Sequence, residues 1–105
     1  MMCTKNRYIT RGVKENIPPF LQNLLWYLIE TMEVEEKDYL QIFHLDSVII
    51  DDKRKQSIIH SQELFVYRKD YLISARQFVT GKIYVIENGT HYTMLLAGNI
   101  SRSST

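Results

Sequence analysis

A switch in hydrophobic period between Arg7 and Trp26 constrains the fold of this chain more than any other sequence feature. The first part, residues 7–13, is rich in β-favouring side chains. Ile17-Pro18-Pro19 follows, and apolar residues then recur at steps of one, three and four. Asn16 can cap a helix, and proline is tolerated in a first turn, where amide donors have no helical partner. The sequence therefore predicts a strand, a turn, and a helix that begins near the proline pair.

The predicted helix carries a broad apolar stripe, flanked by Trp26 and Tyr27. Side chains at these steps fall on one face of a helix, which must be buried against another element. We therefore expect the stripe to be core, packed on a sheet. Its members are Phe20, Leu21, Leu24, Leu25, Leu28, Ile29 and Met32.

Three further segments predict strands of that sheet. After an acidic loop over residues 33–38, residues 39–45 are mostly apolar and suit a central strand covered by the helix. Residues 51–55 form a charged turn, and the β-rich residues 57–63 return from it as the second arm of a hairpin. Tyr71-Leu72-Ile73 is a short apolar piece.

The clearest strand signal is Asn88-Gly89, which separates the β-rich residues 81–86 and 91–96. Asn and Gly tolerate the positive φ that both central residues of a type I′ turn require, so this pair predicts a hairpin. Together these patterns predict an α+β fold. It is a single domain over 1–105, with one main amphipathic helix packed on an antiparallel sheet of about five strands. Residues 1–5 and 100–105 are expected to be frayed.

Composition excludes several classes of protein. A chain of 105 residues with 45% hydrophobic residues holds one folded core. No apolar stretch suits a signal peptide or a membrane span, and the single cysteine, Cys3, cannot form an internal disulfide. We therefore expect a cytoplasmic protein that does not contact membranes.

The net charge of +1 hides an asymmetry along the chain. Residues 30–52 contain eight acidic residues and one lysine, a net charge of −7, whereas residues 53–82 contain seven basic and two acidic residues, a net charge of +5. If folding segregates these segments, an acidic face and a basic face would steer charged partners. If neighbouring strands interleave them, the asymmetry cancels.

The sequence contains no catalytic signature. His44, His60 and His91 fall on three predicted strands and could in principle meet around a metal ion, but their spacing matches no ligand motif, and structural roles explain them as well. Asp51 and Asp52 lie in a charged turn, where carboxylates ordinarily serve solubility rather than acid–base chemistry. We therefore expect a protein that is not an enzyme and that binds no metal or cofactor.

Tyrosines and basic residues form the more serious candidate for a binding surface. Such a set can recognise a protein partner or RNA. Tyrosines also pack across strands, and the net charge lacks the excess typical of nucleic-acid binders. The candidate partner-binding residues, acidic and basic together, are Glu33, Glu35, Glu36, Asp38, Asp51, Asp52, Lys53, Arg54, Lys55, Tyr67, Arg68, Lys69 and Tyr71.

Several blocks of the sequence resemble one bacterial family. They include residues 7–13, Ile17-Pro18, residues 38–43, residues 58–63 and residues 80–86, in order over about residues 5–96. Together they resemble the small Firmicutes family catalogued as domain of unknown function nine hundred and sixty. That family has no assigned catalytic residues, so the resemblance transfers none. Its members are often associated with phages, plasmids and conjugative elements.

The resemblance implies a non-enzymatic inhibitor of a type II-A CRISPR nuclease, an anti-CRISPR protein. It would act by binding the nuclease or by interfering with guide-RNA assembly. Such nucleases hold nucleic acids in positively charged channels, so the acidic segment 30–52 is expected to compete there and the basic segment to touch guide RNA. Three alternatives stay open: an RNA-binding or protein-binding module without a defence role, a metal-dependent hydrolase that uses the histidines, and, for the oligomeric state, a homodimer along a strand edge.

Overall fold

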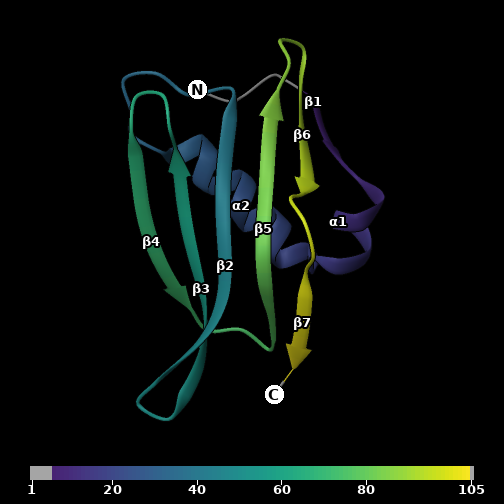
Figure 1. Ribbon diagram of the computed structural model, residues 1–105, viewed down its shortest axis with the longest axis vertical. Coiled ribbons are helices and arrows are strands. Elements are labelled where there is room, and N and C mark those ends of the chain that lie inside the picture. Colours follow the sequence, from purple (N-terminus) through teal and green to yellow (C-terminus); the bar gives the residue numbers. More distant parts are fainter. Residues whose placement is uncertain (1–5, 105) are drawn as a thin grey trace.

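The computed structural model describes residues 6–104, and Figure 1 shows their arrangement. Strands dominate, and the long helix lies across the back of the sheet in this view. No helix within the described residues is long and apolar enough to cross a membrane. In chain order the elements are β1 (Asn6–Ile9), α1 (Arg11–Asn16), α2 (Pro19–Thr31), β2 (Leu40–Ile50), β3 (Lys53–Gln62), β4 (Tyr67–Ile73), β5 (Gln77–Glu87), β6 (His91–Leu96) and β7 (Ser101–Ser104).

The described strands form one mixed sheet in the order β1-β6-β5-β2-β3-β4, with β7 paired to the beginning of β5. Neighbouring strands run antiparallel except β1, which is parallel to β6. The predicted central strand is confirmed as β2, which lies between β3 and β5. The sheet therefore has β1 and β4 at its edges and its longest strands in the middle.

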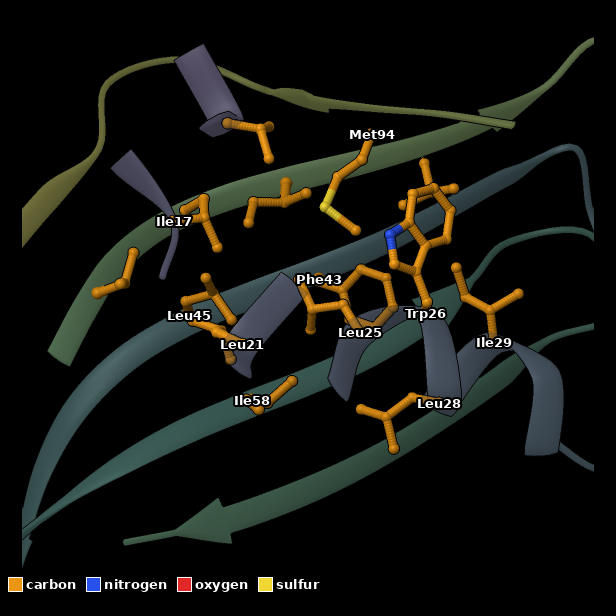
Figure 2. Packing of buried hydrophobic residues seen from close by; sticks show 14 residues of the cluster. Ile17, Leu21, Leu25, Trp26, Leu28, Ile29, Phe43, Leu45, Ile58 and Met94 are labelled. Carbon is orange, nitrogen blue, oxygen red and sulfur yellow. The ribbon is translucent and has the colours of Figure 1, made fainter. Parts of the chain in front are cut away.

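The core lies between α2 and one face of the sheet (Figure 2). Leu21, Leu25 and Ile29 of the predicted stripe are buried there and meet Phe43 of β2 and Met94 of β6. Burial of each such side chain contributes roughly 1.5–3 kcal/mol. The helix stripe is thus confirmed as core.

Two aromatic residues of α2 lie differently from what the stripe predicts. Phe20, expected inside, is 44% exposed at the start of the helix. Trp26, expected at the margin, is buried and packs edge-on against Tyr92 at a ring-centre distance of 6.3 Å. The guanidinium of Arg7 lies 5.2 Å from the Trp26 ring centre and pairs with Glu30. The helix is therefore rotated so that its tryptophan faces β6 and β1.

The predicted strand over residues 7–13 is only half correct. β1 ends at Ile9, and residues 11–16 form the short helix α1. The Thr10 side chain caps this helix by accepting a hydrogen bond from the backbone N–H of Val13 at 3.4 Å. A threonine cap with Val13 buried beneath it outweighs the β propensity of the segment. Asn16, expected to cap the second helix, instead donates from its side chain to the Gly12 carbonyl.

Both predicted hairpins exist, but the Asn88-Gly89 turn is not of the type expected. In the β5–β6 hairpin Gly89 has φ +92°, whereas Asn88 does not have positive φ, so the turn is not type I′. In the β2–β3 hairpin Asp51 and Asp52 have φ +52° and +65°. The left-handed pair that a type I′ turn requires therefore lies in the charged turn.

Gln56 replaces a missing strand contact in the middle of the sheet. Pairing of β2 with β5 ends at Leu45 and Gly81, and beyond this point the buried Gln56 of β3 reaches β5 directly. Its side chain accepts from the Val79 N–H at 2.8 Å and donates to the Val79 carbonyl at 3.0 Å. The amide thereby satisfies buried backbone groups in the way a neighbouring strand would.

The expected fold class is wrong. In place of one main helix on about five antiparallel strands, residues 6–104 have seven strands in one mixed sheet and two short helices, 53% strand and 19% helix. Residues 53–56 and 67–70 are charged or polar, so they lack the apolar alternation by which half-buried strands are recognised. They are strands because neighbours pair with them.

The expected fraying of residues 100–105 is corrected in part. Ser101–Ser104 form β7, which pairs with residues 77–80 of β5. The chain reaches β7 by passing close over Gly81, where an added Cβ would lie 3.0 Å from the Asn99 carbonyl oxygen. Residues 1–5 and 105 lie outside the described part of the chain, so the expectations for them are not addressed.

Candidate functional site

The sheet has one covered face and one open face. α2 packs on the face that carries Phe43 and Leu45, and the alternating side chains of the same strands point away from it. The helices in Figure 1 lie behind or beside the sheet, and its front carries no element. We call this front the open face.

Strand register places apolar side chains side by side across the open face. One row runs from Leu95 through Tyr84, Ile42 and Ser61 to Arg68. The next row runs from Lys82 through His44 and Ile59 to Asp70. The aliphatic and tyrosine side chains in these rows are only partly buried, so the centre of the open face is an apolar strip with polar ends.

A shallow groove of about 780 Å³ runs along the open face. Ile42, Ile59 and Tyr84 form its apolar floor, and Val66 lies at one end. Its polar lining includes His44, Lys82, Arg68 and Glu63. This volume is in the range of ligand-binding clefts, with apolar walls and a few polar groups.

The charges beside the groove are partly paired. Arg68 donates from Nε to Asp70 at 3.0 Å, and this hydrogen bond lowers the pKa of the Asp70 carboxyl while it raises the pKa of Arg68. The Lys82 ammonium lies 5.9 Å from the Tyr84 ring centre. Lys82 is thus the cation that faces the apolar strip most directly.

The turn between β3 and β4 presents three consecutive exposed apolar residues, Leu64, Phe65 and Val66, which we call the apolar turn. Val66 is 87% exposed, and Phe65 has φ +56°, a left-handed conformation that costs a non-glycine residue energy. Strained residues persist only where their surroundings hold them. Here the amide of the buried Gln62 donates to the carbonyls of Leu64 and Phe65 at 2.9 and 2.8 Å.

A buried polar network lies beneath the apolar turn. Gln41 donates to the Gln62 side-chain oxygen at 2.7 Å, and Gln62 donates to the Glu36 carbonyl at 2.9 Å. His60, fully buried, stacks on Phe43 at a ring-centre distance of 4.4 Å. Burial, with a smaller contribution from Lys37, lowers the pKa of His60 to about 4. The network joins the acidic loop to the apolar turn, and burial keeps His60 neutral.

Comparison with known proteins places the chain in a family. Residues 6–99 match the family described as a staphylococcal protein of unknown function (DUF960). The chain belongs to this family. Among solved structures it is similar to a protein of unknown function from Enterococcus faecalis, with a TM-score of 0.72, 20% identity and 91% of each chain covered. That likeness shows a shared fold. No curated protein matches the chain.

In this family member the predicted partner-binding residues do not form one surface. The acidic loop and the charged turn lie at opposite ends of β2, whose 11 residues span about 35 Å. At the charged turn Asp51 and Asp52 are followed directly by Lys53, Arg54 and Lys55, which places acidic and basic residues at the same end of the hairpin. The opposite charges are interleaved at this end.

The structure does bring one predicted subset together. Glu33 and Glu35 line a small hollow of about 260 Å³ with Phe65 and Tyr67. Burial, a hydrogen bond with Tyr71 and the charge of Glu33 raise the pKa of Tyr67 to about 12. Lys69 and Tyr71 follow on the same edge strand, on the helix side. Of the predicted basic set, Arg68 alone lines the groove on the open face.

The three histidines do not converge. His60 is buried on the helix side, opposite Phe43, whereas His44 lies opposite Ile59 on the open face. His91 contacts Tyr8 edge-on at the far edge of the sheet. Within residues 6–104 no group of three or more His, Cys, Asp or Glu side chains is arranged to hold a metal ion.

Sequence reasoning missed the residues that define the open face. Ile42, Ile59 and Tyr84 were assigned to strands but not to a surface. Their signal was available, because apolar residues at both alternating positions of β2 indicate a strand with two apolar faces, while a single helix can cover only one. The apolar turn gave a weaker signal, since Leu64-Phe65-Val66 resembles a continuation of β3.

Proposed function

We propose that this protein is a non-enzymatic binding protein that recognises a protein partner through the open face of its sheet, and that this partner is a type II-A CRISPR nuclease. The observation that supports a binding role is the apolar strip of Ile42, Ile59 and Tyr84, which has no helix over it. Contiguous exposed apolar surface on a folded domain is typical of interaction sites.

The chemistry of the open face favours protein over nucleic acid as its ligand. Ile42 and Ile59 lie in the centre of the two rows, beside the rings of Tyr84 and His44, and aliphatic side chains offer no flat surface on which a base can stack. Asp70 also offsets Arg68, which leaves Lys82 as the one lysine or arginine of the groove lining without an ion pair within residues 6–104. An apolar centre with a charged rim is the usual anatomy of a protein interface.

The apolar turn extends this surface. Val66 lines the groove and also the hollow beside the acidic loop, so the turn stands between the two. Its backbone is held by Gln62, which reduces the entropy that the turn loses on binding. We expect Leu64 and Val66 to contact the partner together with the open face.

The partner class comes from the family resemblance, and the structure suggests how the contact would differ from mimicry of DNA. Six of the eight acidic residues of the segment 30–52 lie at the two ends of β2, while Asp46 lies within the strand and Glu30 in α2, so they do not make a continuous strip. The protein would therefore occlude a surface of the nuclease rather than imitate a duplex in its charged channel.

Mixing the purified protein with type II-A nucleases before and after guide-RNA loading tests this proposal. Inhibited DNA cleavage is expected, together with a direct complex in size-exclusion chromatography. Unchanged cleavage in both orders of addition, across several nucleases, would refute the assignment of the partner. The open face would then remain a binding surface for another protein.

A matched pair of variants tests the surface separately from the partner. Tyr84→Ser removes a ring from the open face, whereas Tyr27→Ser removes one from the outer side of α2, where it is 58% exposed. Loss of inhibition in the first and not in the second is expected. Equal effects of both would contradict the placement of the site.

A further inference from the structure

A second hollow lies away from the open face, where α1, the start of α2 and the strands β5 and β7 come together. It has a volume of about 400 Å³ and shares no lining residue with the groove on the open face. Its lining has a charged side, formed by Lys14, Arg76 and Arg102, and an apolar side, formed by Pro18, Pro19 and Phe20. This volume is at the small end of the range for ligand sites.

Three cations meet at this hollow from parts of the chain far apart in sequence. Lys14 comes from α1, Arg76 precedes β5, and Arg102 belongs to β7. Within residues 6–104, none of the three makes an ion pair. The acidic residue in the lining, Glu15, is held by Arg11 at 3.0 Å. The hollow therefore has a net excess of positive charge, which favours an anionic ligand.

The apolar side carries an exposed aromatic ring. Phe20 is 44% exposed and stands outside the buried cluster, although it belongs to the apolar stripe of α2. No side chain caps the start of this helix, so the positive end of its dipole also faces the region of Phe20. A flat apolar ring beside three cations can contact a base and a phosphate of one nucleotide.

We propose that this hollow binds single-stranded nucleic acid, with backbone phosphates on Lys14, Arg76 and Arg102 and an unpaired base on the Phe20 ring. The flexible exposed cations can follow a strand without fixing its sequence, so binding is not sequence-specific. This proposal does not depend on the proposed function, because a different set of residues carries it.

Fluorescence anisotropy with labelled oligo(U) and oligo(dT) tests the proposal on the full chain. Three phosphate contacts predict that log K falls with log salt concentration with a slope of about −2 between about 25 and 200 mM salt, at roughly −0.7 per contact. Replacing one cation by Gln should reduce this slope by about 0.7. Phe20→Ala should weaken binding about tenfold, because base stacking is lost.

Two triple variants that remove the same charge distinguish binding at the hollow from nonspecific electrostatic attraction by the whole protein. Lys14→Gln, Arg76→Gln and Arg102→Gln together should weaken binding at least about tenfold at low salt. Lys37→Gln, Lys53→Gln and Lys69→Gln together remove the same charge from exposed positions elsewhere and should leave affinity within about twofold. Far-ultraviolet circular dichroism and thermal unfolding verify that each variant is folded.

Two results would overturn the proposal. One is the absence of binding to either oligonucleotide at low salt by the folded wild-type protein. The other is an equal loss of affinity in the two triple variants, which would show attraction by net charge without a site at the hollow.

Discussion

The side-chain oxygen of Gln41 lies 2.7 Å from Nε2 of the buried His60. Because the Gln41 amide nitrogen donates to Gln62 and to the Asp38 carbonyl, its oxygen is the acceptor, and Nε2 of His60 carries the proton. Nδ1 is then unprotonated, and it is buried without a hydrogen-bond partner within the described residues. Protonation of His60 would place a charge in this enclosed network.

The stability of the protein should therefore depend on pH through His60. Its pKa is lowered from 6.5 to about 4 by burial, so the unfolded chain takes up a proton that the folded protein excludes. The free energy of unfolding is therefore highest above pH 6.5. It falls by about 3 kcal/mol as the pH falls towards 4. Urea unfolding at a series of pH values measures this change.

Two histidine variants isolate that contribution from the carboxylates, which also titrate in acid. His60→Gln should show a free energy of unfolding that depends less on pH between 7 and 4 than the wild type. His44→Gln, on the open face, should keep the wild-type dependence because His60 is intact. A steep profile retained by His60→Gln would show that other groups cause it.

Gln56→Leu should destabilise the protein by about 2–3 kcal/mol, because the Val79 N–H and several carbonyls lose a buried partner. Gln77→Leu, an exposed glutamine at the start of β5, should change stability by no more than about 0.5 kcal/mol. Chemical denaturation of both variants measures the difference. A loss below about 1 kcal/mol in Gln56→Leu would mean that water replaces the amide.

Replacing Asp51-Asp52 with Asn-Gly should stabilise the β2–β3 hairpin by about 0.5–1 kcal/mol, because both positions have positive φ and these residues adopt it at lower cost. Asp52→Ala should instead destabilise the hairpin, because the positive φ remains and alanine tolerates it less well than aspartate does. Differential scanning calorimetry should show the two melting temperatures on opposite sides of the wild type.

The apolar turn should be nearly neutral for stability and important for partner binding. Leu64→Ser with Val66→Ser removes apolar surface that is already in water, so thermal unfolding should change little. Binding of the partner should weaken by about tenfold or more if these side chains fill a pocket on it. Ile49→Ser, 72% exposed near the charged turn, is the control and should bind as the wild type does.

Local patterns in the sequence were sufficient to predict the core and the hairpins. The apolar period from Leu21 to Met32 corresponds to the buried side of α2, and the Asn88-Gly89 pair marks a real hairpin. These features depend on residues near one another in sequence, for which periodicity and turn chemistry are direct signals.

Features that depend on distant pairing could not be predicted in the same way. β1 and β7 are only four residues long, and each is a strand because it pairs with β6 or β5. Gln56 and Phe20 also differ from their sequence signals, one polar and buried, the other apolar and exposed. The candidate sites share this dependence, because Lys14, Arg76 and Arg102 meet only after folding.

The parallel pairing of β1 with β6 places a constraint on when the protein can complete its sheet. Tyr8 is opposite Thr93, about 85 residues later in the chain. At a synthesis rate of about 5–20 residues per second, β1 waits roughly 4–17 s for its partner strand β6 to be synthesised. During part of this interval α2 has only β2 and β3 to cover its apolar side, so the nascent chain is expected to depend on chaperones or on slow release for its solubility.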